Sequence, residues 1–181
     1  MADLSHIAVL EKGVAAWNAW RLEAQDVTPD LSDHDLTGSN LEGIDFRNVN
    51  LLGAFLTVTE LDTAVLDGAD LRGANLTGAD LSNASLAGAR LSAADLSYAT
   101  LTSADCSAAD LSQTRLVETI FFNARLRGAN LDGAYLKRTI LTGADLSGAS
   151  MTGARLRDAV LDGATLPIGM PPPETGSERD G

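Results

Sequence analysis

Hydrophobic residues recur along this chain with a strict period of five. From Leu31 to Leu166 every fifth position is apolar, and Leu fills 24 of the 28 tandem units. The exceptions are Phe46, Cys106, Phe121 and Met151. Five residues advance about 500° around an α-helix, so no helical face could collect this stripe. On a flat strand an odd period would send successive Leu side chains to opposite faces. The pattern therefore predicts a solenoid that turns regularly and directs each Leu inward.

The five-residue units also share their other positions. Ala stands two places before the central residue in 19 of the 28 units. Residues 69–73 (ADLRG), 74–78 (ANLTG) and 79–83 (ADLSN) match the consensus A(D/N)LXX and resemble the pentapeptide-repeat family. The resemblance implies an all-β solenoid, a right-handed quadrilateral parallel β-helix with four repeats per coil. The 28 units would then make about seven coils, about 34 Å long at an inter-strand spacing of roughly 4.8 Å.

The period changes ahead of the repeats. Apolar residues at steps of three and four predict an amphipathic helix from residue 5 to about residue 25. These residues are Ile7, Leu10, Val14 and Trp17. Ser5 or Asp3 can act as its N-cap, and Pro29 ends any helical continuation. We expect this helix to cover the open end of the coil stack above Leu31 and Phe46. Binding of a partner through Trp17 or Trp20 is the alternative.

These patterns divide the chain into three segments. Residues 1–28 are expected to form the capping helix and a linker, residues 29–168 the repeat β-helix, and residues 169–181 a disordered, proline-rich acidic tail. Residues 13–21 (GVAAWNAWR), followed by 29–32 (PDLS), are also similar to the lead-in of many bacterial pentapeptide-repeat proteins. No segment after Leu166 resembles a capping or dimerising helix, so the last coil is expected to be bare unless a second molecule covers it.

Composition limits the binding partners and the cellular location that we expect for the protein. The net charge of -12 would repel nucleic-acid phosphates, so we expect no direct nucleic-acid binding. No apolar stretch has the length of a membrane span, and the N-terminal residues lack the order of a signal peptide, which predicts a cytoplasmic location and no membrane association. Cys106 is the single cysteine and occupies the inward register, so we expect it to be a small buried hydrophobe.

The search for catalytic chemistry finds no candidate. The two histidines, His6 and His34, belong to different segments and lie near no cysteine. Phosphate loops, nucleophile elbows and dinucleotide fingerprints are absent from the sequence, and the many glycines two places after the central Leu suit turns. We therefore expect no catalytic residue, no cofactor-binding site and no metal site, and the chain is predicted not to be an enzyme.

Four repeats per coil would place side chains on faces by arithmetic. The face that contains Leu41, Leu61 and Leu81 carries five acids and no Lys or Arg, and it is a candidate acidic face. The acids are Glu42, Glu60, Asp62, Asp80 and Asp162. A surface that keeps the protein soluble is one interpretation, and a docking face for a basic partner is the other.

Toward its C-terminal end the same face becomes apolar. A candidate interface ridge consists of Ile120, Phe122, Ile140 and Val160. Self-association as a homodimer, binding of another protein, or simple β-propensity would each explain it. The neighbouring face collects basic residues that are partly offset by Glu118 and Asp158, so either cross-coil ion pairing or the docking of an acidic partner is expected. The basic residues are Arg115, Lys137, Arg138, Arg155 and Arg157.

Two functions follow for a protein of this kind. The first is a non-catalytic protein–protein interaction scaffold built from a rigid β-helix. The resemblance implies the second, a DNA-mimicking binder of DNA gyrase or topoisomerase IV that inhibits the enzyme or protects it from drugs. The acidic balance fits the second function. The polar C-terminal segment and the dominance of Leu over Phe at the inward position speak against it.

Overall fold

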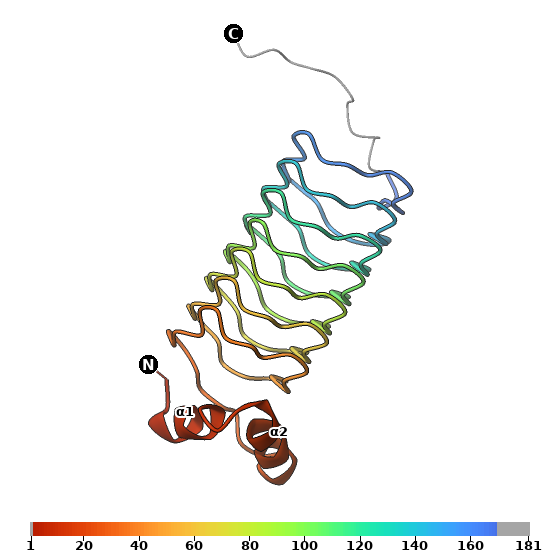
Figure 1. Ribbon diagram of the computed structural model, residues 1–181. Helices are drawn as coiled ribbons and strands as arrows, with labels where there is room; N and C mark the ends of the chain where they lie inside the picture. Colours follow the sequence, from red (N-terminus) through yellow and green to blue (C-terminus); the bar gives the residue numbers. More distant parts are fainter. Residues whose placement is uncertain (1, 170–181) are drawn as a thin grey trace.

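The computed structural model describes residues 2–169, which form two short helices followed by a regular coil (Figure 1). The helices are α1 (Leu4–Leu10) and α2 (Val14–Glu23). The coil is held by isolated parallel β-bridges between residues twenty places apart, from Asp30 with Asn50 to Asp145 with Thr165. Four five-residue units therefore complete one turn. We number the coils 1 to 7, beginning at residues 30, 50, 70, 90, 110, 130 and 150.

Each side of a coil bonds to both neighbouring coils. We call the residue directly before each central apolar residue the bridge residue. Phe55, a bridge residue of coil 2, donates its N–H to the carbonyl oxygen of His34 in coil 1 at 2.9 Å. The next residue, Leu56, donates to the carbonyl oxygen of Asn75 in coil 3 at 2.7 Å. This alternation satisfies the backbone along the whole stack without long strands.

The turns between sides use the left-handed backbone region. The second residue after the central apolar residue has φ between 54° and 70° in every unit from Asp33 to Gly163. Glycine adopts this conformation without steric cost, which explains its recurrence there. Val58 and Thr63 occupy the same conformation with φ of 54° and 57°, although β-branched side chains disfavour it. The turn geometry therefore dictates the backbone at this position, whichever residue fills it.

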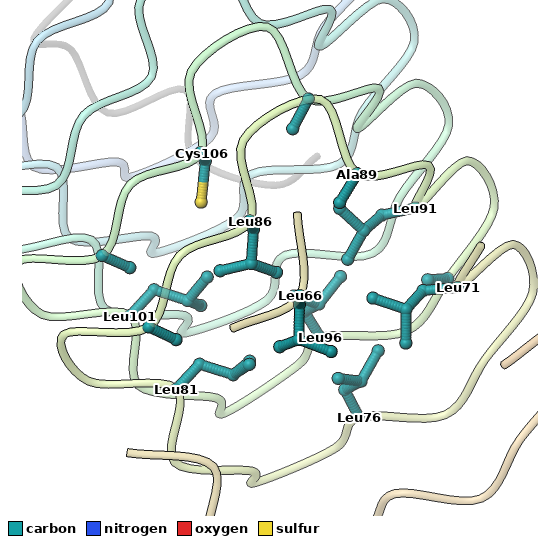
Figure 2. Close-up of a cluster of buried hydrophobic side chains, with 14 of the residues drawn as sticks. Leu66, Leu71, Leu76, Leu81, Leu86, Ala89, Leu91, Leu96, Leu101 and Cys106 are labelled. Atoms are coloured by element: carbon teal, nitrogen blue, oxygen red, sulfur yellow. The ribbon is translucent and has the colours of Figure 1, made fainter. Parts of the chain in front are cut away.

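The core is a continuous column of inward side chains. Figure 2 shows Leu66, Leu86, Leu96 and neighbouring residues directed to the centre of the coils, with Cys106 on the same register. Burial raises the pKa of the Cys106 thiol to about 12, so the group stays protonated and packs as a small hydrophobe, as its register predicts.

Some units have threonine two places before the central residue, where Ala is usual, and the buried threonine hydroxyl forms a hydrogen bond. Thr59 Oγ1 donates to the carbonyl oxygen of Leu36 at 3.0 Å, and Thr119 Oγ1 donates to that of Leu96 at 2.8 Å. Both acceptors belong to the preceding coil. These bonds compensate the loss of water that burial imposes on a hydroxyl.

The N-terminal segment differs from the single helix that the sequence predicts. The helix breaks between α1 and α2, where Gly13 has φ of 93°. Asp3 is the N-cap of α1, since its carboxylate accepts from the Ser5 N–H at 2.7 Å. Neither helix of residues 2–169 combines the length and the hydropathy needed to cross a membrane. Apart from Gly169, the predicted tail lies outside the described residues.

Candidate interaction surfaces

The helix α2 lies against the open end of coil 1 (Figure 1). Trp17 is fully buried, and its ring meets Phe46 edge-on with centroids 5.5 Å apart. Its indole Nε1 donates to the carbonyl oxygen of Asp45 at 2.7 Å. Leu10 is also buried, and Ile7 and Val14 pack half-buried against the same core. The burial of Trp17 leaves it unavailable to a partner without displacement of the helix.

We call α1, α2 and the residues that flank them the cap. Its polar groups form hydrogen bonds with the backbone of coil 1, which has no preceding coil to bond to. The Asn18 amide donates to the carbonyl oxygen of Gly43 at 2.9 Å and accepts from the Asp45 N–H at 2.8 Å. On another side, the carbonyl oxygen of Asp30 accepts from the Asp3 N–H at 3.0 Å, and the Asp30 N–H donates to His6 Nδ1 at 3.1 Å. The cap thus bonds to the sides of coil 1 that begin at residues 30 and 45, and it also reaches Gly43 at the end of the side that begins at residue 40.

The candidate acidic face separates into two parts. Glu42, Glu60, Asp62 and Asp80 lie in coils 1 to 3, and the three in coils 2 and 3 accept hydrogen bonds only from neutral groups in the described chain. The Asn83 amide, for example, donates to Asp62 Oδ1 at 3.0 Å. No ion pair of residues 2–169 includes any of these acids. Asp162 lies in coil 7, four coils away from Asp80, and is not part of the cluster.

The bridge register places the apolar ridge in one column. Ile120 pairs with Ile140, and Ile140 pairs with Val160, in coils 5, 6 and 7. Phe122 is 43% exposed and Val160 is 39% exposed, while Ile120 and Ile140 are half-buried. The ridge therefore presents one exposed side chain in coil 5 and one in coil 7, together with two half-buried isoleucines in coils 5 and 6.

Ion pairs neutralise part of the neighbouring basic face. Arg115 Nε lies 3.2 Å from Asp95 Oδ2, and Arg138 Nη1 lies 3.2 Å from Glu118 Oε1. Both pairs join residues twenty places apart in adjacent coils. This cross-coil pairing agrees with the first of the two interpretations of the basic face.

Comparison with known proteins identifies the family. The family model for pentapeptide repeats matches eight copies over residues 30–68, 64–102, 99–138 and 139–166. The chain belongs to the pentapeptide repeat family. Members of the family form right-handed quadrilateral β-helices and are generally non-catalytic structural or binding proteins.

Two solved structures illustrate the relationship of this pentapeptide repeat protein to others. HetL, a pentapeptide repeat protein involved in heterocyst differentiation regulation in the cyanobacterium Nostoc sp. strain PCC 7120, is 35% identical, with 78% of this chain and 69% of HetL covered and a TM-score of 0.50. QnrB1, a plasmid-mediated fluoroquinolone resistance protein, is 24% identical, with coverage of 76% and 77% and a TM-score of 0.63. The likeness to QnrB1 concerns the fold alone. No curated protein matches the chain significantly.

Two features of this pentapeptide repeat protein escape the sequence prediction. Leu52, Phe55 and Val58 form exposed apolar positions in coil 2, with exposed fractions of 41%, 49% and 63%. Phe55 is a bridge residue, so the arithmetic that singled out Ile120 could also have found it. The second feature is the partial coverage of coil 1 by the cap, which depends on the position of α2 and has no sequence signal.

The remaining candidate groups assemble no chemical site. His34 lies half-buried in coil 1, and His6 bonds to the Asp30 backbone. Within residues 2–169, no three His, Cys, Asp or Glu side chains lie close enough together to hold a metal ion.

Proposed function

We propose that this pentapeptide repeat protein is a non-catalytic interaction scaffold that binds a protein partner through the ridge of Ile120, Phe122, Ile140 and Val160. The observation that carries the proposal is the alignment of apolar bridge residues in three successive coils, where polar residues are usual. Exposed apolar surface of this kind is typical of interfaces. The rigid ladder fixes the spacing of the side chains, so little conformational entropy is lost when a partner binds.

A second copy of the chain is the first partner to test. The ridge reaches coil 7 at Val160, where the central residues Leu156, Leu161 and Leu166 are only half-buried. A molecule that covered the ridge and this end together would bury both apolar surfaces at once. Continuity between the two surfaces favours a homodimer over a partner that contacts the ridge alone.

The test is a pair of charge substitutions. Phe122→Asp with Val160→Asp places two carboxylates at the exposed ends of the ridge, and Phe122→Asp with Ile140→Asp extends the test to its centre. We expect a cooperative thermal transition to persist and association, measured by sedimentation equilibrium, to be lost. Ala93→Asp with Ala108→Asp, at exposed positions of coil 4 on other sides of the stack, is the matched control and should associate as the wild type does. Unchanged association in the ridge variants would reject this surface as the interface.

The acidic cluster supports a second candidate function. Glu42, Glu60, Asp62 and Asp80 carry negative charge without a cationic partner in the described chain, as a surface that imitates nucleic-acid phosphates requires. The fold that the chain shares with QnrB1, a fluoroquinolone resistance protein, motivates the choice of enzyme. The candidate function is binding to DNA gyrase or topoisomerase IV in place of DNA.

A supercoiling titration of gyrase, with and without a quinolone and at two salt concentrations, tests this second function. Inhibition or drug protection that weakens with salt would support it, because screening reduces the attraction between separated charges. Glu60→Gln with Asp62→Asn and Asp80→Asn should then remove the effect, whereas Asp162→Asn should not. No effect at micromolar protein would reject the DNA-mimic function and leave the scaffold proposal standing.

A further inference from the structure

The backbone of coil 1 has a row of hydrogen-bonding groups with a fixed direction. In coil 2, the Phe55 N–H donates toward coil 1, and the carbonyl oxygens of Phe55 and Thr57 accept from the coil 1 residues Leu36 and Gly38 at 2.8 and 2.9 Å. The same groups in coil 1 have no preceding coil to bond. They point instead toward the end of the stack on which the cap lies.

The cap leaves two sides of this row open. On the side that begins at Asp35 and on the next, which begins at Asn40, no described residue accepts from the bridge N–H groups. The carbonyl oxygens of Asp35, Thr37, Asn40 and Glu42 likewise have no donor among residues 2–169. Asp35 and Asn40 are exposed, whereas Asp30 and Asp45, which the cap contacts, are half-buried. Two backbone N–H donors and four carbonyl acceptors of the described chain are thus unpaired, at the spacing with which a neighbouring strand of a parallel β-ladder would bond to them.

A pocket lies between this open edge and the cap. Its volume is about 390 Å³, within the range of ligand-binding pockets. Its apolar lining comes from Leu10 and Val14 of the helical segment and from Leu36 and Leu41 of coil 1. Leu36 and Leu41 are 4% and 5% exposed, whereas Leu31 and Phe46 under the cap are 0% exposed. The pocket therefore offers an apolar recess directly beside unpaired backbone groups.

The charge around the pocket is acidic. Glu11 and Asp35 line it, and the exposed carboxylates of Glu42 and Glu60 lie on the adjoining side of coils 1 and 2. Lys12 follows Glu11 in the turn between α1 and α2, and His34 also lines the pocket. Together with the net charge of -12, this arrangement attracts a cationic segment and repels an acidic one.

From these observations we infer that the open half of coil 1 is a second interaction site, distinct from the ridge, which binds an extended basic peptide segment of a partner protein. The segment adds to the ladder as a strand, with its backbone bonded to residues 35–42. One apolar side chain enters the pocket, and Lys or Arg side chains face the surrounding carboxylates. In strand addition of this kind the backbone bonds supply affinity and the pocket supplies specificity. This inference does not rest on the function proposed for the ridge.

The probe is a library of random nine-residue peptides displayed for selection against the full chain. The peptide that is most enriched is synthesised, and its dissociation constant is measured by calorimetry against two double variants. Asp35→Pro with Asn40→Pro removes both outward N–H groups, at edge positions where proline is tolerated. Asp35→Ala with Asn40→Ala is the matched control, because it removes the same side chains and keeps both N–H groups.

We expect the selected peptides to combine Lys or Arg with an apolar residue, and the proline variant to bind about tenfold or more weakly than the alanine variant. In the wild type, binding should slow hydrogen exchange at the Asp35 and Asn40 amides. This readout stands even if the proline variant fails to fold. The absence of any enriched peptide, enrichment of acidic peptides, equal affinity of the two variants, or unchanged exchange at both amides would each overturn the inference.

Discussion

The two ends of the β-helix bury their last apolar layers to different extents. At the N-terminal end all four central residues of coil 1 are buried, and the most exposed of them, Leu41, is 5% accessible. At the C-terminal end all four central residues of coil 7 are half-buried. They are Met151, Leu156, Leu161 and Leu166. The same repeat therefore ends once in a finished core and once in an open layer.

The difference teaches what a solenoid needs at its ends. A coil in the middle of the stack receives hydrogen bonds and apolar cover from identical neighbours. At the N-terminal end a few unlike residues supply both: Trp17 covers Phe46, and Asn18 bonds to the backbone of residues 43 and 45. The end of a solenoid can thus be covered by any element that presents the right groups, and it need not be covered on every side.

The largest effect is expected from removal of the cap's central residue. Trp17→Ala should lower the free energy of unfolding by about 3–5 kcal/mol, because it opens a cavity above Phe46 and leaves the carbonyl oxygen of Asp45 without its donor. Urea unfolding followed by circular dichroism measures the loss. Trp20→Ala, at a half-buried position of the same helix, is the control and should cost clearly less. Equal losses would show that cover of the N-terminal end does not depend on Trp17.

The second prediction compares equivalent Leu residues inside the stack and at its open end. Leu101→Ala in coil 4 should cost about 2–5 kcal/mol, since Leu101 is fully buried. Leu161→Ala, on the same face in coil 7, should cost roughly 1 kcal/mol, because a partly exposed side chain loses less apolar burial than a fully buried one. Denaturant midpoints of the two variants measure the difference. If both variants lost the same stability, the last coil would have to be covered in solution, as a homodimer through that end requires.

The fold of the repeat region could be predicted from the sequence because the period of five excludes both helix and flat strand. The spacing of twenty between bridged residues follows from four units per coil, which only the resemblance to the pentapeptide-repeat family implied. The break between α1 and α2 was missed, because Ile7, Leu10, Val14 and Trp17 keep a helical spacing across it. Gly13 breaks the helix through a backbone conformation that the apolar pattern does not register.

The candidate surfaces were predictable only as far as they depend on register. Arithmetic placed Ile120, Ile140 and Val160 in one column, and the same spacing of twenty residues per coil separates Asp162 from Asp80 by four coils. The open edge at Asp35 and Asn40 could not be predicted. It depends on which sides of coil 1 the helices reach, and tertiary packing decides this.

The third prediction tests whether coil 7 is folded but poorly covered, or whether it unfolds before the rest of the stack. Gly73 and Gly153 both adopt left-handed φ, 64° and 70°, and both have open space where a Cβ would lie. Gly73→Ala and Gly153→Ala should therefore introduce the same backbone strain, about 1 kcal/mol each. Equal losses in thermal unfolding would mean that coil 7 is folded and only poorly covered. A loss at Gly73→Ala alone would mean that coil 7 unfolds before the rest. Ala93→Gly, at φ of 60°, is the reverse control and should stabilise.

The smallest effect concerns carboxylates at the two ends. The Arg47 guanidinium, which donates to Asp45 in coil 1, lowers the pKa of that carboxyl from its usual value. In coil 6, the Ser150 hydroxyl and the Thr152 N–H donate to Asp132 and lower its pKa as well.

A carboxyl group whose pKa is lowered by folding stabilises the protein at pH values above its unfolded pKa, near 3.9. This contribution disappears as the pH falls through the folded pKa. Stability measured by urea unfolding should therefore decrease between pH 6 and pH 3, and Asp45→Asn should reduce this decrease. Asp132→Asn should reduce it less, because Asp132 bonds to the poorly covered coil 7, whereas Asp45 belongs to the coil on which the cap is built. A larger change for Asp132→Asn would reverse this ranking and identify the C-terminal end as the more tightly coupled one.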